Sequence, residues 1–229
     1  MKNQDRTPLL DVLLARAKRG VTSFHTPGHK NGQGIDKRLR SYTGRNAYKL
    51  DVTVFPEVDS LHDPVGPIKK AQALMADAYG VKYSQFLVNG SSCGNIAMLM
   101  SACHPGDSVI VSRNAHKSIL SGIIMSGVWP IWIQPKVDQH LDVIFDSDAA
   151  QVEQALHQFP EAKAVFVTSP TYHGVTTDLK KIADLCHAHG KLLLVVVERD
   201  RRLDSCMFRI IKQQQLPDLL VQAQHQLLI

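Results

Sequence analysis

The sequence predicts an α/β fold with a mostly parallel β-sheet. Short apolar runs with the length and composition of buried strands recur along the chain. These runs are residues 84–89, 108–112, 129–134, 164–168 and 191–197. Segments with helical spacing of apolar residues alternate with them. These segments lie near residues 91–103, 117–126, 148–158 and 178–189. Alternation of strands and helices is typical of parallel sheets with helical crossovers.

The composition is that of an ordinary globular protein. The 229 residues are 44% hydrophobic and 21% charged, with a formal net charge of +5 and a pI near 9.0. Apart from Arg199, Arg201 and Arg202, the cationic residues are scattered, whereas nucleic-acid binders concentrate them on one element. No apolar run reaches membrane-spanning length. We therefore expect neither a nucleic-acid nor a membrane partner.

The cysteines and the N-terminus indicate a cytoplasmic protein. Cysteines occupy positions Cys93, Cys103, Cys186 and Cys206, without CxxC spacing. They are typical of reduced and mostly buried thiols. The first twenty residues contain no uninterrupted apolar run and no small-residue cleavage site, so we expect no signal peptide.

Residues 1–62 are expected to form an N-terminal helix and a lead-in segment. Thr7 is positioned to cap the helix, with Pro8 at its first position and Gly20 at its end. Residues 21–62 favour few regular elements, because "FHTPGHKNGQG" is rich in Gly and Pro. His25 and His29 have no evident acidic partner, so we expect no zinc site.

The α/β part is expected to span residues 63–229. A helix is predicted to begin at Asp63-Pro64 and to continue to Gly80. The strands and helices of the alternating pattern follow it. In such sheets, ligands bind outside the carboxyl ends of the strands. The residues after each predicted strand are therefore the candidates for a binding site.

Gly90, Ser91 and Ser92 follow the first predicted strand and open a helix. Free backbone N–H groups, two hydroxyls and the positive end of a helix dipole suit a phosphate group. The alternative is an ordinary serine N-cap. The segment matches neither a Walker loop nor the GxGxxG pattern.

Two further loops contribute candidates. His116 follows the second strand and could stack on a planar cofactor or transfer a proton. The alternative is a surface histidine near a helix cap. Ser169 and Thr171 follow the strand at residues 164–168, as polar contacts or simply as turn formers.

Taken together, five segments resemble the Orn/Lys/Arg decarboxylases between about residues 7 and 195. These segments read "FHTPGHKNG", "DVTVFPEVDSLHDPVGPIKKAQ", "FLVNGSSCGN", "CHPGDSVIVSRNAHKS" and "TSPTYHGVTTDLKKIADLCHAHG". The resemblance implies the three-layer large domain of pyridoxal 5'-phosphate (PLP) enzymes of the aspartate-aminotransferase fold. It also implies a basic amino acid substrate, a role in polyamine biosynthesis, and an active site at a dimer interface.

The resemblance assigns cofactor contacts to particular residues. Ser91 and Ser92, with the backbone after Gly90, would hold the PLP phosphate, and His116 would stack on the pyridine ring. Ser169 and His225 would make further cofactor contacts. No metal is implied.

Two positions depart from the family pattern. The family has an aspartate for the pyridine nitrogen in "VDEAHG", where this chain reads "LLLVVVERDRR", with Val196 in register or Val197 after one insertion. The family has the Schiff-base lysine in "QS-x-HK", where Gln226 stands here, and glutamine cannot form an imine. We therefore expect no useful decarboxylation. The alternatives are a non-catalytic partner of an intact homologue, or a binder of PLP or phosphate without chemistry.

The last part of the chain resembles the family less. Residues 198–215 have no visible counterpart in it, and the C-terminal small domain that the resemblance implies is expected to be absent. Open sheet edges would then favour aggregation or pairing with a partner. We expect either a homodimer or a heteromer with an intact homologue.

Overall fold

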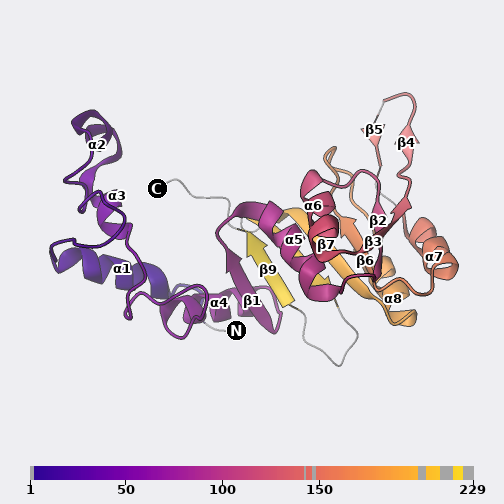
Figure 1. The fold of residues 1–229 in the computed structure, drawn as a ribbon, viewed down its shortest axis with the longest axis horizontal. Coiled ribbons are helices and arrows are strands. Elements are labelled where there is room, and N and C mark those ends of the chain that lie inside the picture. Colours follow the sequence, from indigo (N-terminus) through magenta and orange to yellow (C-terminus); the bar gives the residue numbers. More distant parts are fainter. Residues whose placement is uncertain (1–2, 142, 146–147, 201–204, 212–218, 224–229) are drawn as a thin grey trace. The chain divides into compact units, whose positions relative to one another are not determined.

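A computed structural model describes residues 3–141, 143–145, 148–200, 205–211 and 219–223 (Figure 1). The chain divides into two compact units, one ending at Gly80 and one starting at Val81. The first unit is helical within its described residues, and the second is an α/β fold.

The first unit contains more helix than its sequence indicates. Its helices are α1 (Pro8–Lys18), α2 (Lys37–Thr43), α3 (Arg45–Leu50) and α4 (Pro67–Ala78). The sequence predicts few regular elements in residues 21–62 and does not indicate the two short helices, α2 and α3, that the described structure has there. Asp36 caps α2 by accepting a hydrogen bond from the Arg38 N–H, and Gly44, with φ +76°, separates the two helices.

Helix α1 begins where Pro8 predicts, but its capping differs from the prediction. The Thr7 side chain makes no capping bond to the backbone. Its hydroxyl donates instead to Asp11 Oδ1 at 2.9 Å. The helix ends before Gly20, whose φ of +66° a residue with a side chain would rarely adopt.

Helix α4 begins at Pro67, so the predicted start at Asp63-Pro64 is wrong. The cause is the buried carboxylate of Asp59, which accepts bonds from four backbone N–H groups in the loop before the helix and in its first turn. The donors are Ser60, Val65, Gly66 and Ile68, at 2.7–3.1 Å. These bonds hold the segment before Pro67 as a loop. Because proline has no N–H to lose, it suits the first helical position.

The second unit follows the predicted alternation closely. Its strands are β1 (Tyr83–Leu87), β2 (Ser108–Ser112), β3 (Trp129–Ile133), β4 (Val137–Asp138), β5 (Val143–Ile144), β6 (Ala164–Thr168), β7 (Leu192–Asp200), β8 (Ser205–Ile211) and β9 (Leu219–Ala223). Its helices are α5 (Gly90–Ala102), α6 (Lys117–Ser126), α7 (Ala149–Gln158) and α8 (Leu179–Ala188). The fold class is therefore confirmed.

Seven of the described strands form one sheet, in the order β1-β9-β8-β7-β6-β2-β3 (Figure 1). The pairs β1–β9, β7–β6, β6–β2 and β2–β3 are parallel, and β8 runs antiparallel to both of its neighbours. The two reversals at β8 cancel, so β1 runs in the same direction as β2, β6 and β7. The sheet is mostly parallel, as predicted.

Helices cover both faces of this sheet, and β7 shows how the sequence specifies this arrangement. Leu194 and Val196 belong to the apolar cluster under α5 and α6, whereas Leu193 and Val195 belong to the cluster under α7 and α8. Successive side chains of a strand point to opposite faces. A continuous apolar run therefore indicates a strand buried on both sides.

The strand at 191–197 is longer than predicted. Strand β7 continues to Asp200, and β8 pairs with it antiparallel in a segment where the family resemblance offers no counterpart. The residues "ERD" at 198–200, which follow the predicted end of the strand, are part of β7.

Candidate functional site

The candidate site lies at one edge of the sheet in the second unit. Because β1, β2 and β6 run in the same direction, their carboxyl ends meet at that edge. The segments that follow them begin at Gly90, at His116 and at Ser169. The topology therefore brings the three predicted loops to a common edge.

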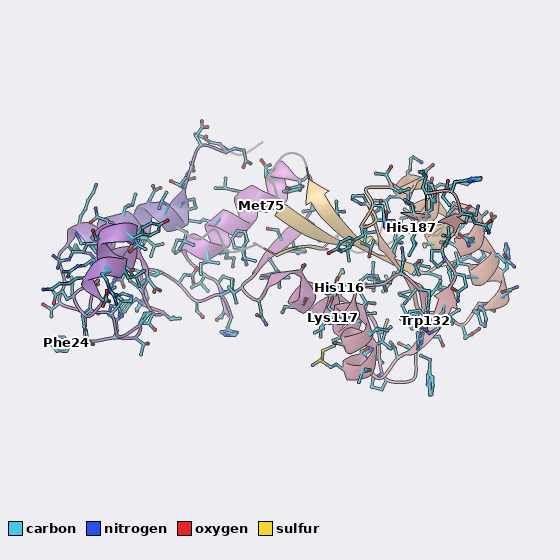
Figure 2. All side chains as sticks on the ribbon, turned by 90° about the horizontal axis from the view of Figure 1, so that it is seen from above. Phe24, Met75, His116, Lys117, Trp132 and His187 are labelled. Carbon is cyan, nitrogen blue, oxygen red and sulfur yellow. The ribbon has the colours of Figure 1, made fainter. Side chains whose placement is uncertain are left out.

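A cavity of about 360 Å³ opens beside two of these loops. It is lined by Arg113, Asn114, Ala115, His116, Ile144, Thr168, Thr171, Tyr172 and His173. His116 lies at the start of α6 in Figure 2. Neither Gly90–Ser92 nor Ser169 lines this cavity.

His116 is the N-cap of α6. Its ring Nδ1 accepts a hydrogen bond from the Ser118 N–H at 3.1 Å and lies 2.7 Å from Ser118 Oγ. A histidine near a helix cap was the alternative to a cofactor contact, and the capping part of that interpretation is confirmed. The ring remains exposed, and its stacking on a cofactor stays a prediction.

The helix after β1 begins one residue earlier than a serine cap requires. Asn89 is the N-cap, and Gly90, Ser91 and Ser92 are the first helical residues, so the alternative of a serine N-cap is wrong. The Asn89 side chain makes no capping bond. The N–H groups in the first turn of a helix have no hydrogen-bond acceptor within that helix, and the Asn89 side chain supplies none here.

Ser169 and Thr171 organise their own turn. Ser169 Oγ accepts from the Thr177 N–H at 3.1 Å, and Thr171 Oγ1 accepts from the Val175 N–H at 3.2 Å. Both side chains are buried. They act as turn formers, one of the two roles predicted for them, and a direct cofactor contact by Ser169 stays a prediction.

Val196 occupies the position at which the family pattern has an aspartate. Its side chain is 2% exposed, among the apolar residues under α5 and α6. It pairs with Thr168 of β6 and with Phe208 of β8, and its carbonyl accepts the Ser169 N–H at 2.9 Å. Val197, which takes the aspartate position if one residue is inserted in the alignment, packs against the apolar cluster on the opposite face of the sheet. Neither position supplies a carboxylate.

Two predicted residues, His225 and Gln226, lie outside the described residues, beyond the end of β9 at Ala223. Sequence reasoning also missed a polar residue, Asn95, which is buried in α5 and bonded to Ser118. The signal that could have identified it is an amide side chain directly before the apolar run of residues 96–100.

Two cysteine thiols of the second unit, those of Cys103 and Cys186, offer little reactivity. Burial raises the pKa of Cys103 to about 11 and that of Cys186 to about 12. Both are buried, as predicted, whereas Cys93 is half-buried. A thiol with so high a pKa carries almost no thiolate at neutral pH.

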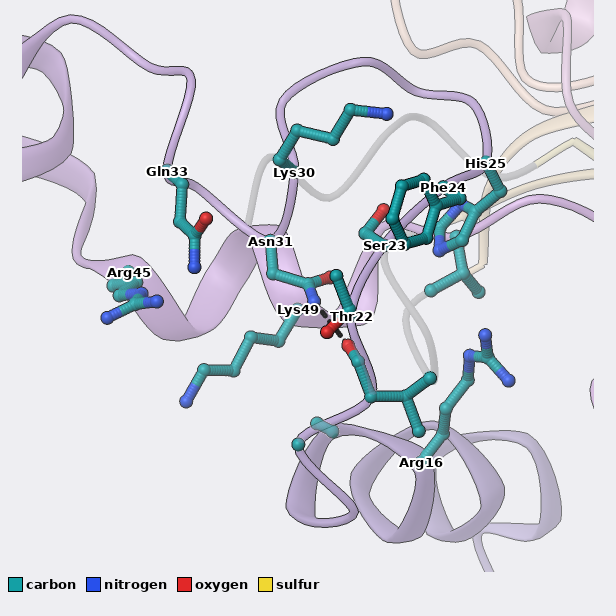
Figure 3. Close-up of a pocket in the computed structure, with 14 residues that line it drawn as sticks. Arg16, Thr22, Ser23, Phe24, His25, Lys30, Asn31, Gln33, Arg45 and Lys49 are labelled. Carbon is teal, nitrogen blue, oxygen red and sulfur yellow. Dashed lines mark hydrogen bonds between the residues drawn. The ribbon is translucent and has the colours of Figure 1, made fainter.

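The first unit has a separate cavity of about 440 Å³, lined in part by Arg16, Lys30, Arg45 and Lys49 (Figure 3). Arg16 is already engaged, since it lies 2.5 Å from Glu57 Oε1 and above the Phe55 ring. In Figure 3 the four cationic side chains point in different directions rather than towards one centre.

One expectation about this unit is wrong. His29 does have an acidic neighbour, because its Nε2 lies 3.3 Å from Asp51 Oδ2. Asp51 is distant in sequence from the "HTPGHK" motif, so the motif alone does not reveal it. In the described part of the chain, no three His, Cys, Asp or Glu side chains are grouped as metal ligands would be.

None of the described helices has both the length and the apolar character needed to cross a bilayer.

Residues 7–197 match the model of the family described as Orn/Lys/Arg decarboxylase, major domain. The chain is 43% identical over 195 residues to an arginine decarboxylase of Halalkalibacterium halodurans, covering 85% of this chain and 40% of that protein. It is 31% identical over 186 residues to a lysine decarboxylase of Pseudomonas aeruginosa, covering 73% of this chain and 25% of that protein.

Solved structures agree on the fold. The constitutive lysine decarboxylase of E. coli matches with a TM-score of 0.71 at 21% identity, over 92% of this chain and 36% of the other. The chain spans about two fifths of the length of the arginine decarboxylases that it matches.

Proposed function

Because this chain belongs to the Orn/Lys/Arg decarboxylase family, we propose that it binds PLP at the sheet edge of the second unit without decarboxylating an amino acid. The observation that carries the proposal is the burial of Val196 in an apolar cluster, where the family resemblance expects a carboxylate. The first turn of α5 and the exposed ring of His116 support retention of the binding site.

The residues near the start of α5 suit a phosphate group. Gly90 has a φ of +68°, and an added Cβ there would meet no atom within 4 Å, so a ligand has room to approach the backbone. The uncapped first-turn N–H groups and the dipole of a 13-residue helix favour an anion. Ser91 and Ser92 would add hydroxyl donors, and His116 would cover one face of the ring.

The position of Val196 does not suit the ring nitrogen. When bound, PLP supplies the electron sink for decarboxylation, and a carboxylate that keeps the ring nitrogen protonated strengthens that sink. A valine opposite the protonated nitrogen would leave a buried cation unpaired, which costs several kcal/mol. Gln226 offers no amine for covalent attachment. Loss of positioned acid–base groups alone slows such reactions by about 10²–10⁴-fold.

The test is a PLP titration of the purified chain, followed by visible absorbance and borohydride treatment. We expect saturable binding that inorganic phosphate weakens, no covalent fixation by borohydride, and no CO₂ release from lysine, arginine or ornithine. Ser91→Ala combined with Ser92→Ala should abolish binding, and Gln226→Lys should make the cofactor fixable. Absence of PLP binding to the native chain would refute the proposal, as would fixation on a native lysine.

A second function is a non-catalytic partner of an intact homologue. It is favoured by large side chains that the first unit leaves exposed, such as Phe24 at 89% and Tyr42 at 92%. On this proposal the complex would be cytoplasmic and would modulate formation of diamines or polyamine precursors. Co-purification of a full-length homologue with the tagged chain would support it, and a monomer that ignores the homologue at micromolar concentration would contradict it.

A further inference from the structure

We infer that Asn95 and Ser118 are positioning residues that fix the tautomer and the orientation of the His116 ring. All the contacts that carry this inference lie among described residues. The identity of the ligand that would stack on the ring rests on the proposed function.

Three hydrogen bonds connect α5, α6 and the ring. Asn95 Nδ2 donates to Ser118 Oγ at 2.7 Å, and Ser118 Oγ lies 2.7 Å from His116 Nδ1. The Ser118 backbone N–H donates to the same ring nitrogen at 3.1 Å. The ring is therefore held from two directions by one residue, and that residue is held by the neighbouring helix.

The directions of these bonds define the tautomer. Since Ser118 Oγ accepts from Asn95, its own hydrogen is free to point at His116 Nδ1. The backbone N–H of Ser118 points at Nδ1 as well. Two donors aimed at one nitrogen require a lone pair there, so the ring hydrogen lies on Nε2. The exposed ring then carries its N–H group on Nε2, the ring nitrogen that takes no part in the helix cap.

Burial makes this arrangement rigid. Asn95 and Ser118 are each 4% exposed, so water does not compete for their bond. Asn95 Oδ1 is also buried and finds no hydrogen-bond partner among the described residues. An unsatisfied buried acceptor is unfavourable, and an apolar residue of similar size would avoid that cost. The bond from Asn95 to Ser118 offsets part of the cost.

The same bonds connect the two halves of the proposed cofactor site. Ser91 and Asn95 are four residues apart in α5, so they lie on the same side of that helix. Asn95 therefore lies on the side of α5 that carries Ser91, and it bonds to Ser118, which holds the ring that would cover the cofactor. Gly122 keeps the two helices close, because a Cβ there would lie 3.2 Å from Ile96 Cα.

A fixed ring matters for binding a flat ligand. A ring already held in the bound orientation loses less freedom when the ligand stacks on it. The bonds also prevent the ring from turning Nδ1 towards the ligand. We expect each positioning bond to contribute about 1 kcal/mol to PLP affinity, or roughly fivefold in Kd.

The first experiment needs no cofactor. Long-range ¹⁵N–¹H correlation spectra of the ligand-free chain report which ring nitrogen of each histidine carries hydrogen, and His116→Asn assigns the signals of His116. We expect an acceptor-type Nδ1 and a hydrogen-bearing Nε2 in the native protein. A hydrogen on Nδ1 would overturn the inference without any further variant.

Variants then test the chain of bonds. Ser118→Ala removes the hydroxyl donor to Nδ1 but keeps the backbone N–H of residue 118. It should therefore shift the ¹⁵N resonance of Nδ1 without changing the tautomer, and raise the Kd for PLP about fivefold. Asn95→Ala should raise that Kd by a similar factor, because it releases the Ser118 hydroxyl. Ser118→Thr should preserve the native Nδ1 resonance, because it keeps the hydroxyl. Ser121→Ala is the matched control, since Ser121 lies on the same helix and bonds only to the Lys117 carbonyl in the described contacts.

The outcomes separate the two proposals. An Nδ1 resonance that does not move in Ser118→Ala would refute the positioning role, whatever PLP does. If the resonance shifts as expected but the native chain binds no PLP, the positioning role stands and the proposed function fails.

Discussion

Asp59 shows how a single side chain decides where a helix begins. It is 6% exposed, has a φ of +84°, and bonds to four backbone N–H groups. Positive φ is unfavourable for a residue with a side chain, so these bonds must compensate for it. Burial alone would raise the pKa of Asp59, but the N–H groups of Val65, Ser60 and Gly66 outweigh it and lower the pKa to about 2.

This pKa predicts how acid affects stability. The unfolded carboxyl titrates near 3.8, so between about pH 4 and pH 2 the folded state binds fewer protons than the unfolded state. The contribution of Asp59 to the free energy of unfolding is therefore complete above about pH 4 and is lost as the pH falls through about 2. At neutral pH, Asp59→Asn should lower the free energy of unfolding by about 2–3 kcal/mol, because an amide accepts fewer of these bonds.

Urea unfolding of Asp59→Asn and the native protein at several pH values measures this effect. The difference between them should shrink from pH 5 to pH 2. Asp63→Asn is the control, because Asp63 is exposed in the same loop. An Asp59→Asn deficit that does not change with pH would contradict the explanation.

The cysteines give a second prediction at the scale of residues. In a Cys206→Ser background, Cys93 should react with a thiol reagent in the folded protein, while Cys103 and Cys186 should react only after unfolding. Burial is the reason, because it both blocks access and raises their pKa values. Reaction of more than one thiol without denaturant, measured by mass spectrometry, would disprove it.

The sequence predicts the sheet edge at which the site lies better than it predicts the side-chain contacts within the site. Gly90 and His116 follow strands, and local pattern alone predicts that position. The bond from Asn95 to Ser118 joins residues in different helices, so it depends on how α5 packs on α6 and local pattern cannot reveal it. The partner of His29 is hidden in the same way, because Asp51 lies in a later segment.

At the scale of elements, α5 and α6 form a close pair. In α6, Gly122 faces α5, and an added Cβ would lie 2.7 Å from Leu99 Cδ1 and 3.2 Å from Ile96 Cα. The first contact can relax through the Leu99 side chain, but the second involves backbone. Glycine is therefore required for this helix spacing rather than for a turn.

Gly122→Ala tests the close packing. Alanine favours a helix interior by up to about 1 kcal/mol, but overpacking usually costs about 1–3 kcal/mol. We expect net destabilisation of about 1–2 kcal/mol by thermal or urea unfolding. Gly28→Ala is the control, since a Cβ at position 28 meets no atom within 4 Å. A more stable Gly122→Ala variant would show that the helices can separate freely.

The elements also show what periodicity can and cannot predict. Strands β2 and β6 and helix α6 have the predicted bounds, because a strong apolar pattern and clear turn residues mark them. The extension of β7 to Asp200 was not predicted, because its charged residues resemble a loop. That extension depends on pairing with β8, which local sequence does not encode.

At the scale of the whole molecule, the two units differ in how much apolar surface they bury. Among the described residues, the buried apolar side chains of the first unit are Val58, Pro67, Ile68 and Ala76, whereas the second unit has two large clusters. Burial of apolar area is the main source of stability. The first unit should therefore open more easily than the second.

Two probes can separate their unfolding. Trp129 and Trp132 both lie in the second unit, so tryptophan fluorescence reports that unit alone. Hydrogen exchange followed by mass spectrometry reports both. We expect amides of residues 8–78 to exchange at lower urea than those of β2, β6 and β7, and before the fluorescence changes. Coincident transitions would mean that the units unfold together.

The sheet order has a consequence during synthesis on the ribosome. Strand β1 pairs only with β9 in the described sheet, and almost the whole second unit is translated between them. While the chain emerges, β1 has no partner strand, and β6 and β7 can pair long before it. Contacts so distant in sequence form late, and unpaired strand edges are prone to aggregate in the meantime. The nascent chain is therefore most dependent on chaperones just before β9 leaves the exit tunnel.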